Sequence, residues 1–290
     1  MIKTELSKKK HRISEEELVK LKEISLEILR DVVTICNREH IPYMLGGGTA
    51  LGAVRHHGFI PWDDDIDLNV PRKYIGLLLE KISSEYGDTY YIEEPVHTPG
   101  YLSSFIQIHK NGTVFREYLA QKKTKCGVKI DIFPIENTYS NSLQRFWHGV
   151  QCEAGLLILS CYRMFAWRKE YRELARGNCK AALVVGFKGL VGMFFAPAHN
   201  FWYKRVQHCL QKCQDETSDY VVMPSGRKHF FGEIYERASF MQLTSILFEG
   251  EEYSITQNYD DYLKQLFGDD YMQLPPEAER EHHMLYQLEL

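Results

Sequence analysis

Four aspartates crowd into five residues of the sequence, and carboxylates at this density favour a hard metal ion. They are Asp63, Asp64, Asp65 and Asp67. The apolar residues Ile66, Leu68 and Val70 alternate with polar ones, which is the period of a β-strand. Side chains two apart on a strand point the same way, so Asp63, Asp65 and Asp67 would share one face if the strand starts early enough. Mg²⁺ accepts such carboxylate oxygens and binds substrate phosphates with its remaining positions.

A glycine turn precedes the acidic segment. Gly46, Gly47, Gly48 and Thr49 follow a short apolar run and lead into a helix-compatible stretch. Backbone N–H groups in such a turn, at the positive end of a helix, form a site for an anion. We therefore predict that Gly47, Gly48 and Thr49 contact phosphate beside a carboxylate-bound metal, as in a nucleotide-transfer site.

Two simpler interpretations of the acidic segment are weaker. A calcium-binding EF-hand loop requires a glycine and a glutamate at positions that Leu68 and Tyr74 occupy. A solvated acidic loop would not show the apolar alternation that follows Asp65.

Three stretches resemble the LicD family of phosphotransferases, which are related to fukutin and fukutin-related protein. They are Leu45–Tyr74 (LGGGTALGAVRHHGFIPWDDDIDLNVPRKY), Val128–Ile135 (VKIDIFPI) and Phe267–His283 (FGDDYMQLPPEAEREHH). The resemblance implies an α/β (α+β) fold, with a nucleotidyltransferase-like mixed sheet flanked by helices. It also implies a third carboxylate on a neighbouring strand, a place that Asp131 matches. The alternative for Asp131 is a structural salt bridge with Lys129 or Lys110.

The same resemblance implies an activity. A phosphoalcohol such as phosphocholine would move from a CDP-alcohol, such as CDP-choline, to a sugar hydroxyl of a cell-surface glycan or teichoic acid precursor, releasing CMP. Asp65, Asp67 and Asp131 would be catalytic, and with Asp63 they would hold Mg²⁺ or Mn²⁺. The acceptor is expected to be lipid-linked. The alternatives are a nucleotidyltransferase that moves the NMP part and releases pyrophosphate, and an inactive glycan-binding protein.

Several cationic side chains could contact the substrate phosphates. They are Arg55, Arg72, Lys110 and Lys129, and the pair His282 and His283 are further candidate substrate ligands within the third matching stretch. A guanidinium suits phosphate oxygens, although Arg55 could also be a surface residue at a helix end. The histidine pair could likewise be a surface feature.

Composition excludes some classes of protein. A chain of 290 residues with 44% hydrophobic and 26% charged residues is expected to be folded and globular. Its net charge of −4 argues against a broad nucleic-acid-binding surface. The seven cysteines, odd in number and without a CxxC pair, favour a reducing compartment. No signal peptide is visible at the polar N-terminus, so we expect a cytoplasmic protein, with peripheral contact at the inner face of the cell membrane left open.

Three regions are predicted along the chain. Residues 1–139 would form the nucleotidyltransferase-like core, residues 140–215 a helical insertion or subdomain, and residues 216–290 a segment that completes the core. The most apolar run, Ala181–Ala198, could be a buried helix, a membrane-interfacial helix or a membrane span. The aromatic and basic residues around it support the interfacial alternative. The sequence leaves the oligomeric state open.

Overall fold

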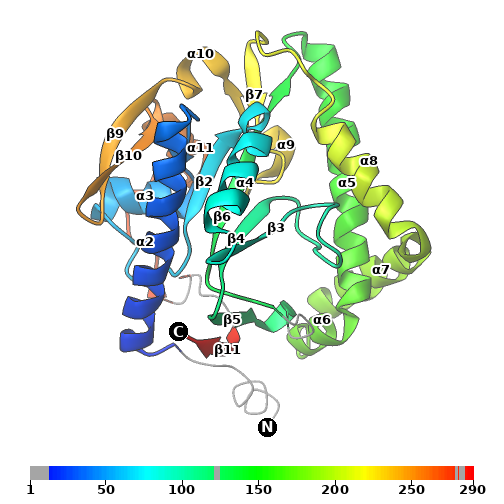
Figure 1. Cartoon of the computed structure of the whole chain (residues 1–290). Coiled ribbons are helices and arrows are strands. Elements are labelled where there is room, and N and C mark those ends of the chain that lie inside the picture. The colour runs from blue at the N-terminus through cyan, green and yellow to red at the C-terminus, as the bar shows by residue number, and fades with distance from the viewer. Residues whose placement is uncertain (1–12, 121–124, 278–279, 281–284) are drawn as a thin grey trace.

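The fold is a mixed β-sheet with helices against one face and a helical arm beside it (Figure 1). The computed structural model describes residues 13–120, 125–277, 280 and 285–290. The central strands run in the order β1 (Met44–Leu45), β2 (Asp67–Pro71), β6 (Lys129–Thr138), β4 (Ile106–Lys110) and β3 (Tyr90–Glu93). The sheet continues from β6 through β7 (Tyr220–Val222) to β8 (Ile234–Glu236). Only β2 and β6 pair in parallel among these strands of the described chain. The expected mixed sheet flanked by helices is confirmed.

Polar and apolar residues occupy alternate rows across this sheet. One row of cross-strand partners consists of Glu93, Gln107, Asp131 and Asp67. The adjacent row consists of Ile106, Ile132 and Leu68, all buried. Because neighbouring rows point to opposite faces, the sheet has one face that carries the acids and one that is apolar.

Two helices cover the apolar face. They are α2 (Glu15–Arg38) and α4 (Arg72–Tyr86), and both contact β6. Helix α2 begins with a capping box, in which Glu17 N–H donates to Ser14 Oγ and Ser14 N–H donates to the Glu17 carboxylate. Ile28 and Leu29 of α2 are fully buried in the main core, so this helix anchors the sheet without facing the acids.

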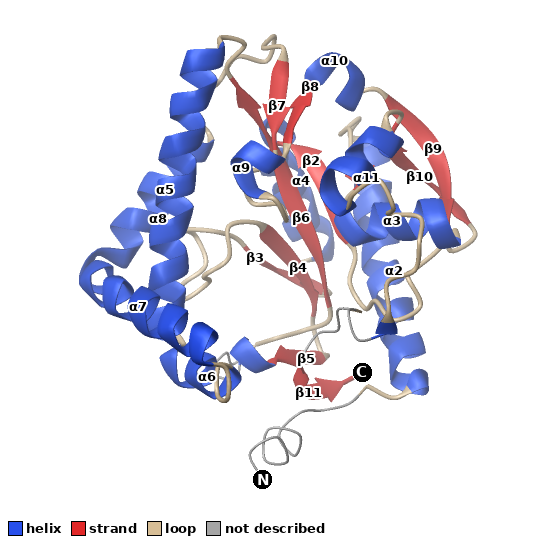
Figure 2. Ribbon diagram, turned by 180° about the vertical axis from the view of Figure 1, so that it is seen from behind, coloured by secondary structure: helices blue, strands red, loops and turns tan. Residues whose placement is uncertain are grey.

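The remaining elements surround the opposite side and the edges of the sheet (Figure 2). The helices are α3 (Gly47–His56), α9 (His229–Gly232), α10 (Arg237–Phe240) and α11 (Tyr259–Phe267), with the short 3-10 turn η1 (Tyr118–Ala120). One hairpin consists of β9 (Leu243–Phe248) and β10 (Glu251–Thr256). A separate two-stranded sheet pairs β5 (Val114–Glu117) with β11 (Leu285–Glu289).

The helical arm follows β6 in the chain. It contains α5 (Ser142–Ala166), α6 (Arg168–Leu174), α7 (Cys179–Phe195), η2 (Ala196–Ala198) and α8 (His199–Leu210). These helices fall within the region predicted for the insertion, and β7 then returns to the sheet by pairing with β6. The division into three regions itself stays a prediction. The buried alternative for Ala181–Ala198 is wrong, since Val185 and Gly192 are the buried positions of α7.

The cysteines form no disulfide, and all seven are free thiols. Cys213 is buried and Cys209 is half-buried, with 3.6 Å between the sulfur atoms of Cys152 and Cys209. The reducing compartment expected from their number and spacing stays a prediction.

The glycines of α7 differ in what surrounds them, and this difference is testable. A Cβ on Gly192 would overlap the carbonyl oxygen of Cys161 in α5, whereas a Cβ on Gly186 would meet nothing within 4 Å. We expect Gly192→Ala to lower the free energy of unfolding by about 1–3 kcal/mol through forced separation of α5 and α7. Gly186→Ala should raise it by up to about 1 kcal/mol through helix propensity. Urea unfolding of both variants measures this, and equal effects would contradict the packing of α7 on α5.

Candidate active site

The acids predicted to act together line one cavity. It has a volume of about 1020 Å³, and Asp63, Asp65, Asp67 and Asp131 all belong to its wall. Strand β2 begins only at Asp67, so Asp63 and Asp65 project from the loop before it and not from the strand itself. Ile66 and Leu68 are fully buried on the apolar side, as the alternation predicts. Asp63 and Asp65 therefore reach the cavity from the loop before β2, and Asp67 reaches it from the strand.

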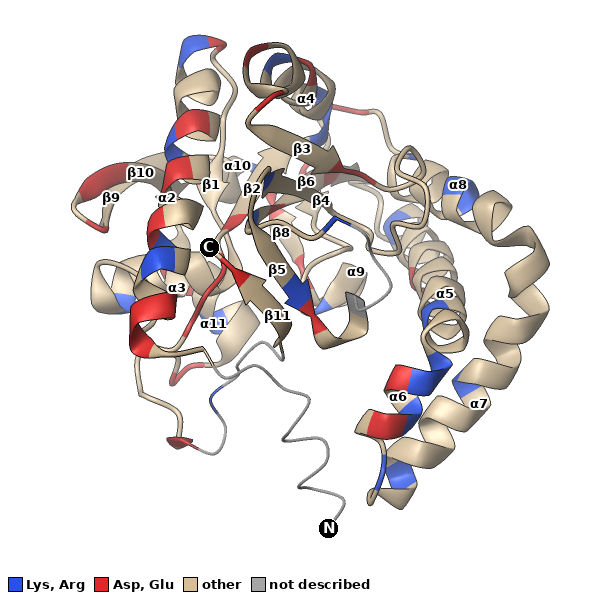
Figure 3. Cartoon of the chain, turned by 60° about the horizontal axis from the view of Figure 1, so that its bottom comes forward, with Lys and Arg blue, Asp and Glu red and all other residues tan. Residues whose placement is uncertain are grey.

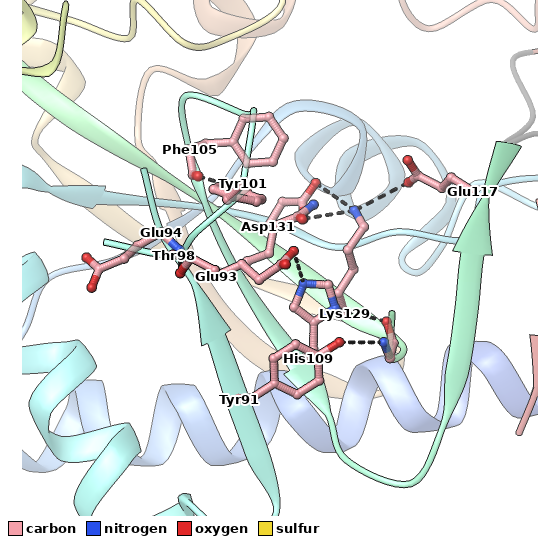
Figure 4. Close-up of polar contacts among 12 residues, drawn as sticks. Tyr91, Glu93, Glu94, Thr98, Tyr101, Phe105, His109, Glu117, Lys129 and Asp131 are labelled. Carbon is pink, nitrogen blue, oxygen red and sulfur yellow. Dashed lines mark hydrogen bonds and ion pairs between the residues drawn. The ribbon is translucent and has the colours of Figure 1, made fainter. Parts of the chain in front are cut away.

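Asp131 comes to the same place through strand pairing. It lies directly opposite Asp67 on the parallel neighbour β6. Its carboxylate accepts hydrogen bonds from Lys129 Nζ (2.9 and 3.0 Å to its two oxygens) and from Gln107 Nε2 (2.9 Å) (Figure 4). The salt bridge with Lys129 weighed from the sequence therefore exists, and Asp131 is still part of the cavity wall. A buried cation holds this acid in place.

The concentration of negative charge shows in the pKa values. Burial, followed by the charges of Asp65, Asp131 and Asp63, raises the pKa of Asp67 well above its usual range, and Lys129 only partly opposes this. Burial lowers the pKa of Lys129, but attraction by Asp131, Glu117 and Asp65 more than compensates, so its pKa rises. Lys129 is therefore a permanent cation, and the cavity still holds more negative charge than Lys129 offsets.

The glycine turn makes room for side chains of the acidic segment. A Cβ on Gly46 would lie 2.6 Å from the Asn69 side chain, and one on Gly47 would lie 2.5 Å from Asp67 Oδ2. A Cβ on Gly48 would lie 3.0 Å from Asp63 Oδ2. Gly47 also has a positive φ of 45°, which suits glycine. Consequently the three glycines let the first turn of α3 approach the carboxylates.

Some polar groups of the glycine turn already form hydrogen bonds with other groups of the protein. The Gly47 N–H donates to Tyr262 Oη (2.9 Å), and Thr49 Oγ1 accepts from the Asp67 N–H (2.8 Å). Thr49 is buried and lies behind the cavity wall, whereas Gly47 and Gly48 form part of it. The phosphate contact predicted for these residues stays a prediction, and Gly48 in the first helical turn is the best placed for it.

The other predicted cations fall in different places. Arg55 lines the cavity, and its Nη1 donates to the carbonyl oxygens of Tyr271 (2.9 Å) and Gln273 (3.1 Å). Arg72 and Lys110 are not among the described residues that line the cavity. Arg72 donates through Nε to Glu136 (2.8 Å), and Lys110 pairs with Glu27. These two pairs tie the sheet to its surroundings, and a substrate role for Arg72, Lys110 and Lys129 stays a prediction.

His282 and His283 lie outside the described residues. Arg280, from the same matching stretch, is described and stacks over the Trp62 ring, with 4.4 Å from the guanidinium carbon to the ring centroid. Both residues line the cavity. A flat cation on an indole at the mouth of an anionic cavity could hold a phosphate or a base ring.

Sequence reasoning did not identify several residues of the cavity wall. Tyr262, from α11, is buried, and its hydroxyl accepts hydrogen bonds from Gly47 N–H and from Asn69 Nδ2 (3.2 Å). Asn69 lies two residues after Asp67 and so shares its face, a signal that the strand period contained. Nothing in the local sequence marked Tyr262, because its partners lie about 200 positions away in the chain.

Glu233 is a second residue that the sequence did not reveal. It lines the cavity, is 2% exposed and packs over Gly226, where a Cβ would clash with its carboxylate. Its Oε1 accepts from the Lys228 backbone N–H (2.7 Å). Burial raises its pKa from 4.5 to about 7, against the opposing hydrogen bond and the charges of Lys228 and Arg227. Arg227 itself lies over the Phe267 ring, 5.5 Å from its centroid.

A polar network lies beside the row of acids on the same face of the sheet (Figure 4). His109 stacks on Tyr91 with 4.7 Å between ring centroids, and its Nε2 lies 3.2 Å from Glu93. Its Nδ1 lies 3.0 Å from the Gly127 carbonyl oxygen, while the Gly127 N–H donates to Tyr91 Oη (2.8 Å). Because His109 is the cross-strand partner of Lys129, this network fixes the strand segment from which Lys129 reaches Asp131.

A magnesium ion at these acids stays a prediction. Among the described residues, no three His, Cys, Asp or Glu side chains form a ready group that could hold a metal. Mg²⁺ needs fewer protein ligands, since it commonly takes one or two carboxylates and completes its shell with water and substrate phosphates. The mutual repulsion that raises the pKa of Asp67 would be relieved by a cation at Asp67 and its neighbours.

Comparison with known proteins supports the resemblance in the motifs. The family described as LicD/FKTN/FKRP, nucleotidyltransferase domain, matches residues 40–153. The chain is 26% identical to the lipopolysaccharide cholinephosphotransferase LicD of Haemophilus influenzae over 277 residues, covering 95% of this chain and 97% of that protein. It is 42% identical to the human ribitol 5-phosphate transferase FKRP over 50 residues, 17% of this chain and 10% of that protein. It is 30% identical to an uncharacterised Rickettsia prowazekii protein over 125 residues, 43% of this chain and 36% of that protein.

Removing the Tyr262 hydroxyl should loosen the glycine turn. In Tyr262→Phe, the Gly47 N–H and the Asn69 amide lose a buried acceptor, so the free energy of unfolding should fall by about 1–3 kcal/mol. Tyr259→Phe on the same helix is the matched control, since Tyr259 is only partly buried. Urea unfolding measures both, and equal stability of the two variants would show that the Tyr262 clamp contributes nothing.

Glu233 should make stability depend on pH. Between about pH 4.5 and 7 the unfolded chain loses this proton while the folded chain keeps it, so the contribution of Glu233 to stability falls as pH rises and is lowest above pH 7. We expect Glu233→Gln to be more stable than the parent at pH 8, by at most about 3 kcal/mol, and little different near pH 4.5. The exposed Glu236→Gln is the control. A difference that stays constant between these pH values would refute the raised pKa.

Proposed function

Because residues 40–153 match the family described as LicD/FKTN/FKRP, nucleotidyltransferase domain, we propose that this chain is a phosphotransferase that transfers a phosphoalcohol from a CDP-alcohol to a sugar hydroxyl. Phosphocholine is the proposed group and CDP-choline the proposed donor. The observation that carries the proposal is the cavity in which Asp63, Asp65, Asp67 and Asp131 meet the glycine turn. Four carboxylates beside backbone donors suit a diphosphate with its metal ion, and they suit few other ligands.

The chemistry follows from the side chains in this wall. The acceptor hydroxyl oxygen forms a bond to the phosphorus that carries the alcohol, and the bond from this phosphorus to the oxygen of CMP breaks. Asp67 or Asp65 takes the proton of the hydroxyl, since general-base catalysis requires a carboxylate within hydrogen-bond reach. Asp131, held by Lys129 and Gln107, keeps a fixed position relative to Asp67 while this happens.

The proposed metal is Mg²⁺ or Mn²⁺, with Asp65 and Asp67 as the first candidate ligands and Asp63 and Asp131 as the others. Bound there, the ion supplies Lewis acidity to the diphosphate and lowers the pKa of the attacking hydroxyl. Gly48 N–H, Arg55 and Arg280 lie in the same wall and would bind phosphate oxygens or the departing CMP.

Part of the cavity wall suits a cationic alcohol in this proposal. Glu233 carries a buried carboxyl group in the cavity wall, and its Oε1 accepts from the Lys228 backbone N–H. Phe267 and Tyr262 add aromatic surface to the same wall. A quaternary ammonium group binds well against aromatic faces, and a nearby carboxylate adds Coulomb attraction. We therefore place the choline end of the donor beside Glu233 in this proposal.

The proposed acceptor is a lipid-linked precursor of a cell-surface glycan, such as a lipopolysaccharide or teichoic acid, reached from the inner face of the membrane. The names of two relatives support this proposal. One is a lipopolysaccharide cholinephosphotransferase, which supports a glycan acceptor and a phosphocholine group, and another is a ribitol 5-phosphate transferase, which supports transfer of a phosphoalcohol. The alternative transfer, of NMP with release of pyrophosphate, uses the same acids and differs in its products.

Binding and product analysis test the proposal together. CDP-choline should bind the purified chain with Mg²⁺ and at least tenfold more weakly without it, and lipopolysaccharide as acceptor should yield CMP. Asp65→Asn should lose at least about a hundredfold in turnover while its unfolding midpoint stays near that of the parent. Asp269→Asn, an exposed acid outside the cavity wall, is the control. Preferential binding of CTP with pyrophosphate release would replace the proposal with the nucleotidyltransferase alternative, and full activity of Asp65→Asn would refute the site.

A further inference from the structure

Helix α7 carries an apolar stripe that the rest of the described chain leaves in solvent. Leu183, Phe187, Leu190 and Phe194 are 74%, 70%, 61% and 78% exposed. Their spacing of four, three and four residues places them along one line of the helix. Val184 and Met193 flank this line and are also exposed. Four large side chains in a row on one helix form a contiguous patch, which isolated surface leucines do not.

The opposite side of α7 is already occupied by α5. Gly192 approaches the carbonyl of Cys161 so closely that a side chain would not fit, and Val185 is buried. Lys188 Nζ donates to Ser160 Oγ of α5 (3.2 Å), which places this cation on the covered side. Helix α7 is therefore apolar all round but covered on one side only, and helices of this kind normally bury both sides.

The charge around the stripe identifies what could cover it. Residues 163–212 contain ten Lys or Arg and two Glu, a net charge of +8, whereas the whole chain carries −4, so the remainder carries −12. The exposed cations near α7 are Arg168, Lys169, Arg172, Arg176, Lys180, Lys204 and Arg205. Basic residues lie on α6, α7 and α8, while most acidic residues lie over the sheet and its helices (Figure 3). An apolar stripe bordered by cations is complementary to an anionic lipid surface.

A second copy of the chain would be a poor occupant, because two regions of charge +8 would repel each other. Crossing the bilayer also fits poorly. The segment Cys179–Leu210 is long and apolar enough by composition to span a membrane, and 11% of its most apolar window is buried. Within it, however, the 17 residues of α7 reach about 25 Å, less than the hydrocarbon thickness of about 30 Å. Pro197 follows in η2, and α8 carries Lys204 and Arg205.

We propose that α7 docks in the plane of an anionic phospholipid membrane, with Leu183, Phe187, Leu190 and Phe194 inserted at the level of the acyl-chain boundary. Lys180 and the basic residues of α6 and α8 then contact the lipid phosphates. Helix α5 connects this surface to the sheet, since α5 packs on α7 and follows β6 directly in the chain. The docking surface itself does not depend on the transferase activity, although a lipid-linked acceptor would benefit from it.

Vesicle flotation of the full chain tests the proposal. We expect it to float with vesicles of phosphatidylcholine containing phosphatidylglycerol, and at least about tenfold less with phosphatidylcholine alone or at about 0.5 M salt. Phe187→Gln combined with Phe194→Gln should weaken binding to the anionic vesicles by at least about tenfold. Both side chains are exposed, so the unfolding midpoint of this double variant should stay near that of the parent.

A matched control distinguishes the stripe from general surface hydrophobicity. Val19→Gln combined with Leu247→Gln removes two apolar side chains that are also exposed but lie on α2 and β9, and this variant should bind as the parent does. Failure of the parent to bind anionic vesicles, or equal binding by both double variants, would overturn the proposal. A lipid-free parent that elutes as a dimer while the α7 variant elutes as a monomer would assign the stripe to self-association instead. Resistance of the bound parent to alkaline extraction would assign it to a membrane span.

Discussion

The cavity depends on one arrangement of charge, the pairing of Asp67 with Asp131 across parallel strands, with Lys129 buried beside Asp131. Two unopposed carboxylates at paired positions of neighbouring strands would repel each other strongly in a buried site. Lys129 contacts both oxygens of Asp131 and so offsets one charge permanently. Burial and the charges of Asp65, Asp131 and Asp63 raise the pKa of Asp67, because they disfavour its ionised form. The proposed function is built on this arrangement, because a cation bound at the acids would relieve their mutual repulsion.

The rest of the fold holds this arrangement in place. The glycine turn can approach Asp67 because it has no side chains, and Tyr262 from α11 fastens the turn to Asn69 in β2. His109 lies beside the acids on the same face of the sheet. It stacks on Tyr91 and contacts Glu93, and these contacts hold β4 and β6, the strands that carry Gln107 and Lys129, in position. On the other face, α2 and α4 bury the isoleucine rows. The acids are thus mounted on strands whose own positions are fixed by packing, as a precise site requires.

The helical arm differs from the sheet region in the sign of its net charge. The sheet and its helices carry a net negative charge, whereas residues 163–212 concentrate positive charge around an uncovered apolar helix. The two surfaces therefore favour different ligands and can be altered independently. Exposed residues on α7 can be changed without touching the cavity wall, which is why the membrane proposal and the transferase proposal can fail separately.

The sequence by itself determined the local features: the strand alternation around Asp67, the glycine turn, the match of Asp131 to a neighbouring strand and the helical character of the arm. These depend on residues close together in the chain, or on motifs with a known arrangement. Only the tertiary structure decided the partners that come from distant segments. Tyr262 and Glu233 reach the cavity from beyond the arm, and Arg72 pairs with Glu136 of β6. Tertiary structure also decided that α7 is exposed, because its apolar periodicity is the same whether one side is covered or both, and only the position of α5 distinguishes them.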